Sequence, residues 1–74
     1  MINVKNKELI KALGNRIREL RVEAGLSQEG LSNEAEIPLS QIGRIERGET
    51  NPTISTLFVI CKAFGIELKD LLDF

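Results

Sequence analysis

The stretch Ser27–Gly48, SQEGLSNEAEIPLSQIGRIERG, decides the fold of this chain. Ser27 is a good N-cap for a short helix beginning at Gln28, because its hydroxyl can accept a hydrogen bond from an amide of the first turn. Pro38 keeps that helix from running past the residue before it, and it suits the first turn of a second helix, where its missing N–H costs nothing. Gly48 is the expected C-cap of the second helix. The stretch therefore predicts two short helices separated by a tight turn.

Apolar residues at helical spacing give each of these helices one inward face. Leu31 and Ala35 lie four positions apart in the first helix. Ile42 and Ile45 lie three positions apart in the second, whose other residues are mostly polar. Two short helices joined in this way form the helix-turn-helix layout, in which the second helix can enter the major groove of DNA.

The central stretch and its flanks resemble the phage-repressor and Cro-like (XRE) helix-turn-helix family. The matching positions are Ser27, Gln28, Glu29, Leu31, Ala35, Ile37, Ile42 and residues 44–48 (RIERG), with 16–21 (RIRELR) before them and 51–53 (NPT) after them. The resemblance extends roughly from Leu13 to Leu72. It implies an all-α fold, a compact five-helix lambda-repressor-like DNA-binding domain with the helix-turn-helix at its second and third helices.

The N-terminal part of the chain predicts one long amphipathic helix. Asn6 is a candidate N-cap, residues 7–24 follow a helical pattern, and Gly25 ends it. Residues 1–5 show no pattern and are expected to be a flexible arm or an extension of the helix. A basic amphipathic helix can also lie on a membrane, but the rest of the chain supplies a core that would receive its apolar face. That face consists of Ile10, Leu13, Ile17, Leu20 and Ala24.

The C-terminal part predicts two more helices. Thr53 is the expected N-cap of a helix over residues 54–64, closed by Gly65, and residues 66–74 form the last helix. Cys61 is interpreted as a small buried apolar residue, since a reactive thiol needs an exposed electropositive setting that the sequence does not show. The expected inward face of the 54–64 helix consists of Ile54, Leu57, Phe58, Cys61 and Phe64.

More apolar residues remain near the C-terminus than one small domain readily buries. Apolar residues scattered singly on a surface are normal, but these are clustered, which favours a homodimer through the last two helices. The expected interface residues are Val59, Ile60, Ala63, Ile66, Leu68, Leu71, Leu72 and Phe74.

Composition narrows the class of protein further. The 74 residues are expected to form one domain, 42% hydrophobic, with no apolar run long enough to span a membrane and no signal-peptide pattern. One Cys and no His disfavour a metal site, exclude a disulfide within the chain and favour the cytoplasm. The sequence pI of 5.4 is weak evidence against nucleic-acid binding, because domains that bind nucleic acid are usually basic. Residues 1–24, however, carry six Lys/Arg against three Glu, and the remainder four against eight acidic residues, so a local basic face exists.

The polar flank of the helix after Pro38 is the candidate DNA-reading surface. Arg44 is the strongest candidate, because its fork can donate two hydrogen bonds to guanine O6 and N7. Ser40 can donate or accept at several bases, and Leu39 suits a thymine methyl group. Gly43 is placed on the same flank, where a bare surface would let the helix sit deep in the groove. The resemblance also assigns base contacts to positions 39, 40 and 44.

Phosphate contacts are expected around this flank. By the resemblance, Gln28 at the start of the first short helix is a phosphate clamp, helped by the positive end of that helix. Such contacts are insensitive to base sequence but sensitive to salt. The other candidates are Gln41, Arg47, Thr50 and Asn51.

Two further positions follow from the resemblance. Arg21 and Glu46 are expected to form a structural ion pair tying the first long helix to the DNA-reading helix, the alternative being two exposed charges of little mutual value. Glu36 stands where the family most often has Gly, at the turn, and a positive φ there would strain the backbone. Ser32 replaces the usual Ala at a tight contact, and Gly30 weakens its helix.

The function expected from these observations is a sequence-specific transcriptional regulator that binds a palindromic operator as a homodimer. Phage repressors and the controller proteins of restriction–modification systems are the small family members that it resembles, and chain length favours the controllers. No small-molecule effector or cofactor is expected. The alternative is an antitoxin-like interaction module that binds another protein through its last two helices. An enzyme is disfavoured, because the chain has no His, phosphate loop or paired-carboxylate cleft.

Overall fold

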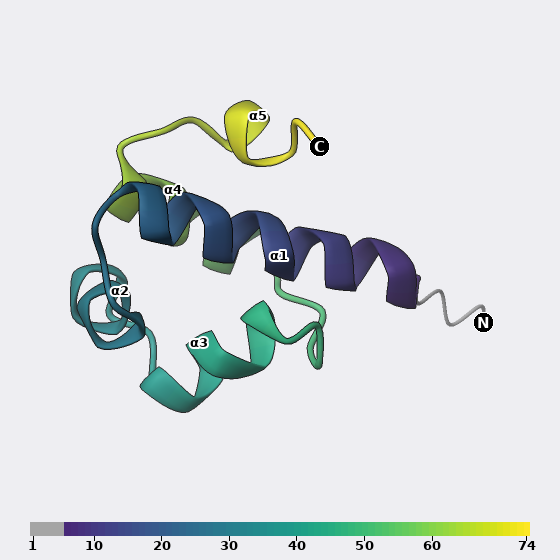
Figure 1. Cartoon of the computed structure of the whole chain (residues 1–74), viewed down its shortest axis with the longest axis horizontal. Helices are drawn as coiled ribbons and strands as arrows, with labels where there is room; N and C mark the ends of the chain where they lie inside the picture. The colour runs from purple at the N-terminus through teal and green to yellow at the C-terminus, as the bar shows by residue number, and fades with distance from the viewer. Residues whose placement is uncertain (1–5) are drawn as a thin grey trace.

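The computed structural model describes residues 6–74, which form five helices and no strand (Figure 1). The all-α prediction is confirmed, while the expected arm at residues 1–5 lies outside the described residues. No helix among residues 6–74 combines the length and the apolar character that crossing a membrane requires. The helices are α1 (Lys7–Glu23), α2 (Gln28–Ala35), α3 (Leu39–Glu46), α4 (Ile54–Phe64) and α5 (Leu68–Leu71).

The predicted N-caps set the helix starts. The side-chain oxygen of Asn6 accepts from the amide of Leu9 at 2.9 Å and begins α1. Ser27 Oγ accepts from the amide of Gly30 at 2.9 Å and begins α2. Thr53 begins α4 in the same way, accepting at 3.2 Å from the amide three residues later. Each cap satisfies an amide that has no partner inside its helix.

The helix ends also follow the turn residues, with one small shift. The glycines that were expected to end α1, α3 and α4 all adopt φ between 73° and 74°, the left-handed region that favours glycine. Pro38 is the residue before α3, with φ −54° and ψ 138°, one position earlier than the predicted first turn. The C-terminal helix covers Leu68–Leu71 only, shorter than the predicted 66–74.

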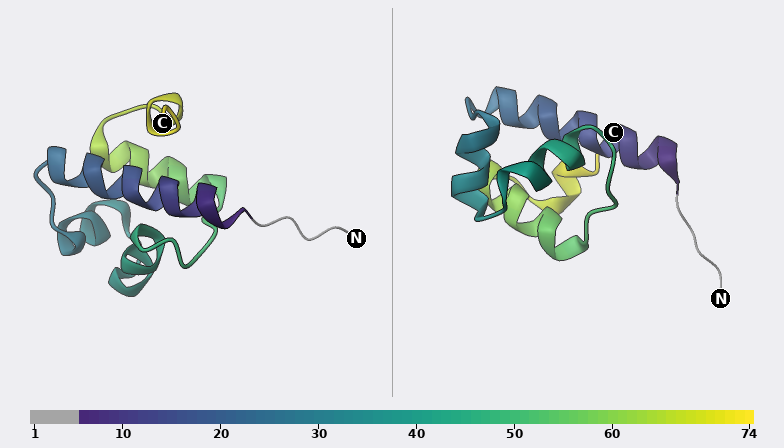
Figure 2. Two further views of the ribbon diagram at one scale, coloured as in Figure 1. Left: turned by 45° about the vertical axis from the view of Figure 1, so that its right-hand side comes forward. Right: turned by 90° about the horizontal axis from the view of Figure 1, so that it is seen from below.

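In Figure 1 and the left view of Figure 2, the long helix α1 crosses the middle of the molecule, with α2 and α3 on one side of it and α5 on the other. Helix α1 packs on α3, α2 packs on α3 and α4, and α4 packs on α5. The buried core draws on all five helices and the turn before α3: Leu13, Ile17, Leu31, Ala35, Ile37, Ile42, Ile45, Leu57, Ile60, Cys61 and Leu71.

Helices α1 and α3 approach each other closely at Gly14, a residue that no sequence pattern marked. A Cβ atom at this position would lie 2.8 Å from the backbone oxygen of Glu46 and closer still to that of Ile45. Both neighbours are backbone atoms of α3, so neither can rotate away. The absence of a side chain at Gly14 therefore fixes how near α1 comes to α3.

The predicted inward face of α4 is partly wrong. Ile54 and Phe58 are each 61% exposed, whereas Ile60, assigned to a dimer interface, is fully buried. Leu57 and Cys61 are buried as expected, and burial raises the pKa of the Cys61 thiol above its ordinary value. Because α4 is apolar nearly all round, periodicity could not choose between its faces. The contacts with α2 and α5 make that choice.

Leu71 is a second correction to the expected dimer interface. Its side chain is fully buried within the monomer, because α5 packs back on α4. Arg16 of α1 also holds α5, since its Nη2 donates to the backbone oxygen of Asp70 at 2.9 Å. At the start of α5 the amide of Glu67 donates to Asp70 Oδ2 at 3.0 Å. Ile60 and Leu71 therefore belong to the core and are not available to a second copy.

Candidate nucleic-acid interface

Helix α3 has one buried and one exposed flank. Ile42 and Ile45 are 1% and 2% exposed, as the spacing predicted. Leu39, Ser40 and Arg44, the candidate base contacts, are all exposed on the other side. The isoleucines fix the rotation of α3 about its axis, and thereby determine that these three side chains face solvent.

A hollow of about 310 Å³ lies between α3 and the segment that leads to α4. It brings together two of the predicted base contacts, Ser40 and Arg44, and three of the predicted phosphate contacts. The latter are Gln41, Thr50 and Asn51. Leu39 does not line it. Four other lining residues were not expected from the sequence, because their roles as turn and cap residues gave no separate signal: Pro38, Pro52, Thr53 and Thr56.

The guanidinium of Arg44 is exposed and makes no hydrogen bond or ion pair to any residue within 6–74. Its five donors are therefore available to a ligand. A planar fork at the edge of this hollow suits bidentate recognition of a guanine edge or a phosphate.

Gly43 does not contribute a bare surface, which corrects the expectation for that residue. It is buried, and a Cβ there would lie 2.9 Å from Nη1 of Arg47. Gly43 therefore makes room for the Arg47 side chain to fold along α3. Arg47 Nε also donates to Glu49 Oε2 at 2.7 Å, and this hydrogen bond lowers the pKa of the Glu49 carboxyl. Because this ion pair is exposed, water and salt weaken it, and a phosphate can compete for Arg47.

Arg21 and Glu46 form a buried ion pair between α1 and α3. Arg21 donates from Nε to Glu46 Oε2 at 2.6 Å and from Nη2 to Oε1 at 3.1 Å. Its Nη1 donates to the backbone oxygen of Leu26 at 2.9 Å. The side chains are 12% and 3% exposed, and the hydrogen bond to Glu46 raises the pKa of Arg21 above its already high value. The pair thus joins α1, the segment before α2 and the end of α3.

Gln28, the predicted phosphate clamp, also belongs to this network. Its Nε2 donates to Glu46 Oε1 at 3.1 Å. One of the two N–H groups of this amide is therefore engaged inside the protein, and the second remains available as a donor. Gln28 therefore helps to hold α3 in position and still has a side-chain donor for the predicted phosphate contact.

The turn between α2 and α3 has the predicted left-handed residue. Glu36 has φ 56° and ψ 43°, an uncommon conformation for a residue with a side chain. Ser32 Oγ donates to the backbone oxygen of Ile37 at 2.6 Å and closes this turn. The hydroxyl that Ser32 has in place of the family's usual Ala thus supports the turn.

Comparison with known proteins identifies relatives over most of the chain. The model of the family described as HTH_3, helix-turn-helix, matches residues 17–71. The HTH-type transcriptional regulator DdrOP3 of Deinococcus deserti is 39% identical over 61 residues, which are 82% of this chain but only 47% of that protein. Control protein C.BamHI of Bacillus amyloliquefaciens is 39% identical over 62 residues, 82% of this chain and 76% of that protein.

A solved structure gives the same result in three dimensions. The restriction-modification controller protein C.AhdI from Aeromonas hydrophila superimposes with a TM-score of 0.81 at 36% identity. The match covers 89% of this chain and 98% of that one. The arrangement of the five helices therefore has a counterpart among controller proteins.

Proposed function

Since this chain belongs to the HTH_3 helix-turn-helix family of DNA-binding transcriptional regulators, and is not an enzyme, we propose that it binds a palindromic operator as a homodimer. One observation carries this proposal. The unpartnered guanidinium of Arg44 stands on the exposed flank of α3, at the rim of the hollow that also contains Ser40 and Asn51.

Helix α3 would enter the major groove with that flank toward the base edges. Arg44 would read a guanine, Ser40 an adjacent polar group, and Leu39 a thymine methyl group. The side chains around this flank would contact the backbone phosphates on either side of the groove. We assign those contacts to Gln28, Gln41, Arg47, Thr50 and Asn51.

A homodimer would place two α3 helices in successive major grooves, about 34 Å apart. The buried residues Ile60 and Leu71 are no longer part of the expected interface. Leu72 and Phe74 are 46% and 54% exposed and remain available for it. The partly buried apolar residues of the expected interface would extend the contact: Val59, Ala63, Ile66 and Leu68. Ile54 and Phe58 add a further exposed apolar strip on α4.

The similarity to C.BamHI and C.AhdI, both named as controller proteins, favours a controller of a restriction–modification system. Such a role would place the protein in the cytoplasm, where the DNA is. Helix α3 would then select the operator, and the concentration of dimer would set its occupancy.

Selection of binding sites from random duplex DNA tests the proposal. We expect recovered sites with two inverted half-sites whose centres lie about one helical turn, or a multiple of it, apart. Purified protein that ignores duplex DNA of every sequence at low ionic strength would refute the proposal and favour the antitoxin-like alternative.

Replacement of Arg44 by alanine should weaken operator binding by roughly 1–3 kcal/mol, because it removes the bidentate hydrogen bonds to one base. The preference at one base position should also relax, and a competition assay with operators altered at each position measures this. Gln41→Ala is a matched change on the same helix and should weaken all sequences alike. If Arg44→Ala also weakens all sequences equally, Arg44 contacts phosphate and not a base.

Replacement of Leu72 by glutamate should convert dimers to monomers, because two like charges would be placed in an apolar contact. Sedimentation equilibrium measures the mass directly. Leu9→Glu puts the same charge on an exposed leucine of α1, 56% exposed and far along the chain from the C-terminal cluster, and should leave the mass unchanged. If Leu72→Glu remains a dimer, the apolar residues near the C-terminus do not form the interface.

A further inference from the structure

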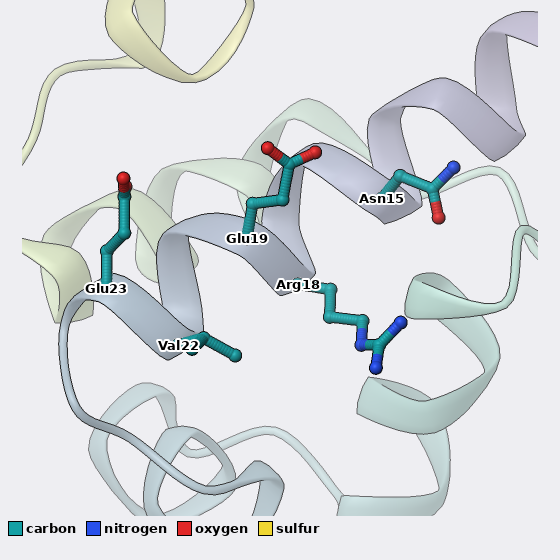
Figure 3. Close-up of a pocket in the computed structure, with 5 residues that line it drawn as sticks. All are labelled: Asn15, Arg18, Glu19, Val22 and Glu23. Atoms are coloured by element: carbon teal, nitrogen blue, oxygen red, sulfur yellow. The ribbon is translucent and has the colours of Figure 1, made fainter.

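A second hollow, of about 520 Å³, lies where α1, the start of α2 and the end of α3 meet. In Figure 3 the Arg18 side chain extends from α1 with its guanidinium pointing toward the α3 ribbon. Three of the α1 residues that line this hollow, Lys11, Asn15 and Arg18, were not among the site residues expected from the sequence. The lining consists of Lys11, Asn15, Arg18, Arg21, Gln28, Glu46 and Arg47.

The charges in this hollow do not cancel. Arg21 and Glu46 at its base neutralise each other through two hydrogen bonds. Arg47 is engaged by an exposed carboxylate outside the hollow. Lys11 and Arg18 are not buried and have no ion-pair partner among residues 6–74. The hollow therefore presents two uncompensated cations and the amide of Asn15, and the Arg21–Glu46 pair at its bottom adds no net charge.

The packing of α1 on α3 fixes these cations relative to the DNA-reading helix. Gly14 lets the two backbones come together beside Ile45 and Glu46, and the buried ion pair ties the same two helices. Lys11, Asn15 and Arg18 follow one another at spacings of four and three, so they share one face of α1. That face adjoins the C-terminal turn of α3, next to which Arg47 lies.

We propose that this hollow receives a backbone phosphodiester of the bound DNA, so that α1 also contacts DNA. The inference rests on the proposed function, because it needs α3 in the major groove. Arg18 would donate from its planar fork to two phosphate oxygens, and Lys11 would add a compact charge. Asn15 would supply an uncharged donor. The described lining contains no aromatic side chain on which a base could stack, so the phosphodiester is the part of DNA that it suits.

The salt dependence of DNA binding tests this inference. In the double variant Lys11→Gln/Arg18→Gln, the slope of log Kd against log salt should fall by about 1 for each phosphate that the protein no longer neutralises. The base preference in the selected operator should not change. Neither side chain is buried, so the fold should persist, and a thermal unfolding curve checks this. Lys62→Gln/Lys69→Gln removes the same net charge from α4 and α5 and should keep the wild-type slope.

Neutralising single phosphates on the DNA locates the contact. A methylphosphonate at the phosphate that faces α1 should weaken binding of the wild-type protein but cause little further loss in Lys11→Gln/Arg18→Gln, because both changes remove the same interaction. Equal slopes for the two double variants, or fully additive losses at every phosphate, would overturn the inference while the proposed function stands. A wild-type protein that binds no DNA would overturn both.

Discussion

Replacement of Gly14 by alanine should destabilise the protein by about 3 kcal/mol, because the new methyl group would collide with backbone atoms of α3. The carbonyl oxygens of Ile45 and Glu46 cannot move without shifting the whole helix. Alanine is a better helix former than glycine by up to about 1 kcal/mol, but this local gain is smaller than the cost of separating α1 from α3.

Thermal unfolding followed by circular dichroism measures the effect. For a domain of this size 1 kcal/mol corresponds to a change in Tm of about 4–8 °C, so the expected fall in Tm is roughly 12–24 °C. Gly30→Ala is the matched control in α2. Its Cβ would meet the Ser27 hydroxyl at 3.3 Å and a methyl group of Leu26 at 3.4 Å, both side-chain atoms. Gly30→Ala should therefore change stability little, and an equally small effect at Gly14 would contradict the close α1–α3 contact.

Replacement of Arg21 by methionine should cost about 3–5 kcal/mol, since it leaves the Glu46 carboxylate buried without its cation. The Glu46 side chain is 3% exposed, so its carboxylate depends mainly on donors from the protein. Gln28 still donates one hydrogen bond, which is too little to compensate a buried charge. Because Glu46 is in α3, operator binding should fall together with stability.

A double-mutant cycle separates the interaction energy of the Arg21–Glu46 pair from the effects of the single substitutions. Arg21→Met/Glu46→Leu removes both charges, and we expect it to be more stable than Arg21→Met alone, since no buried charge is left unpaired. Arg47→Ala breaks the exposed pair with Glu49 and should leave the unfolding midpoint in denaturant unchanged within error. If Arg21→Met were as harmless as Arg47→Ala, the Arg21–Glu46 pair would not hold α1 to α3.

Chemistry between near neighbours in the sequence determined the helices. Caps at Asn6, Ser27 and Thr53 act on amides three residues away, and the turn at Glu36 and the block at Pro38 are equally local. The sequence by itself therefore determined the number of helices, nearly all of their ends, and the helix-turn-helix. It also indicated the exposed flank of α3, because the separation of apolar from polar residues on that helix is clear.

Contacts between residues far apart in the chain were decided by the tertiary structure alone. Helix α4 is apolar on several faces, so only its packing shows that Ile60 is buried and Phe58 exposed. The roles of Gly14, Gln28 and Arg18 depend on how α1 approaches α3, which no pattern within either helix encodes. Caps and turns depend on hydrogen bonds between residues a few positions apart. The choice of buried face and the shape of a hollow depend on the packing of the whole core.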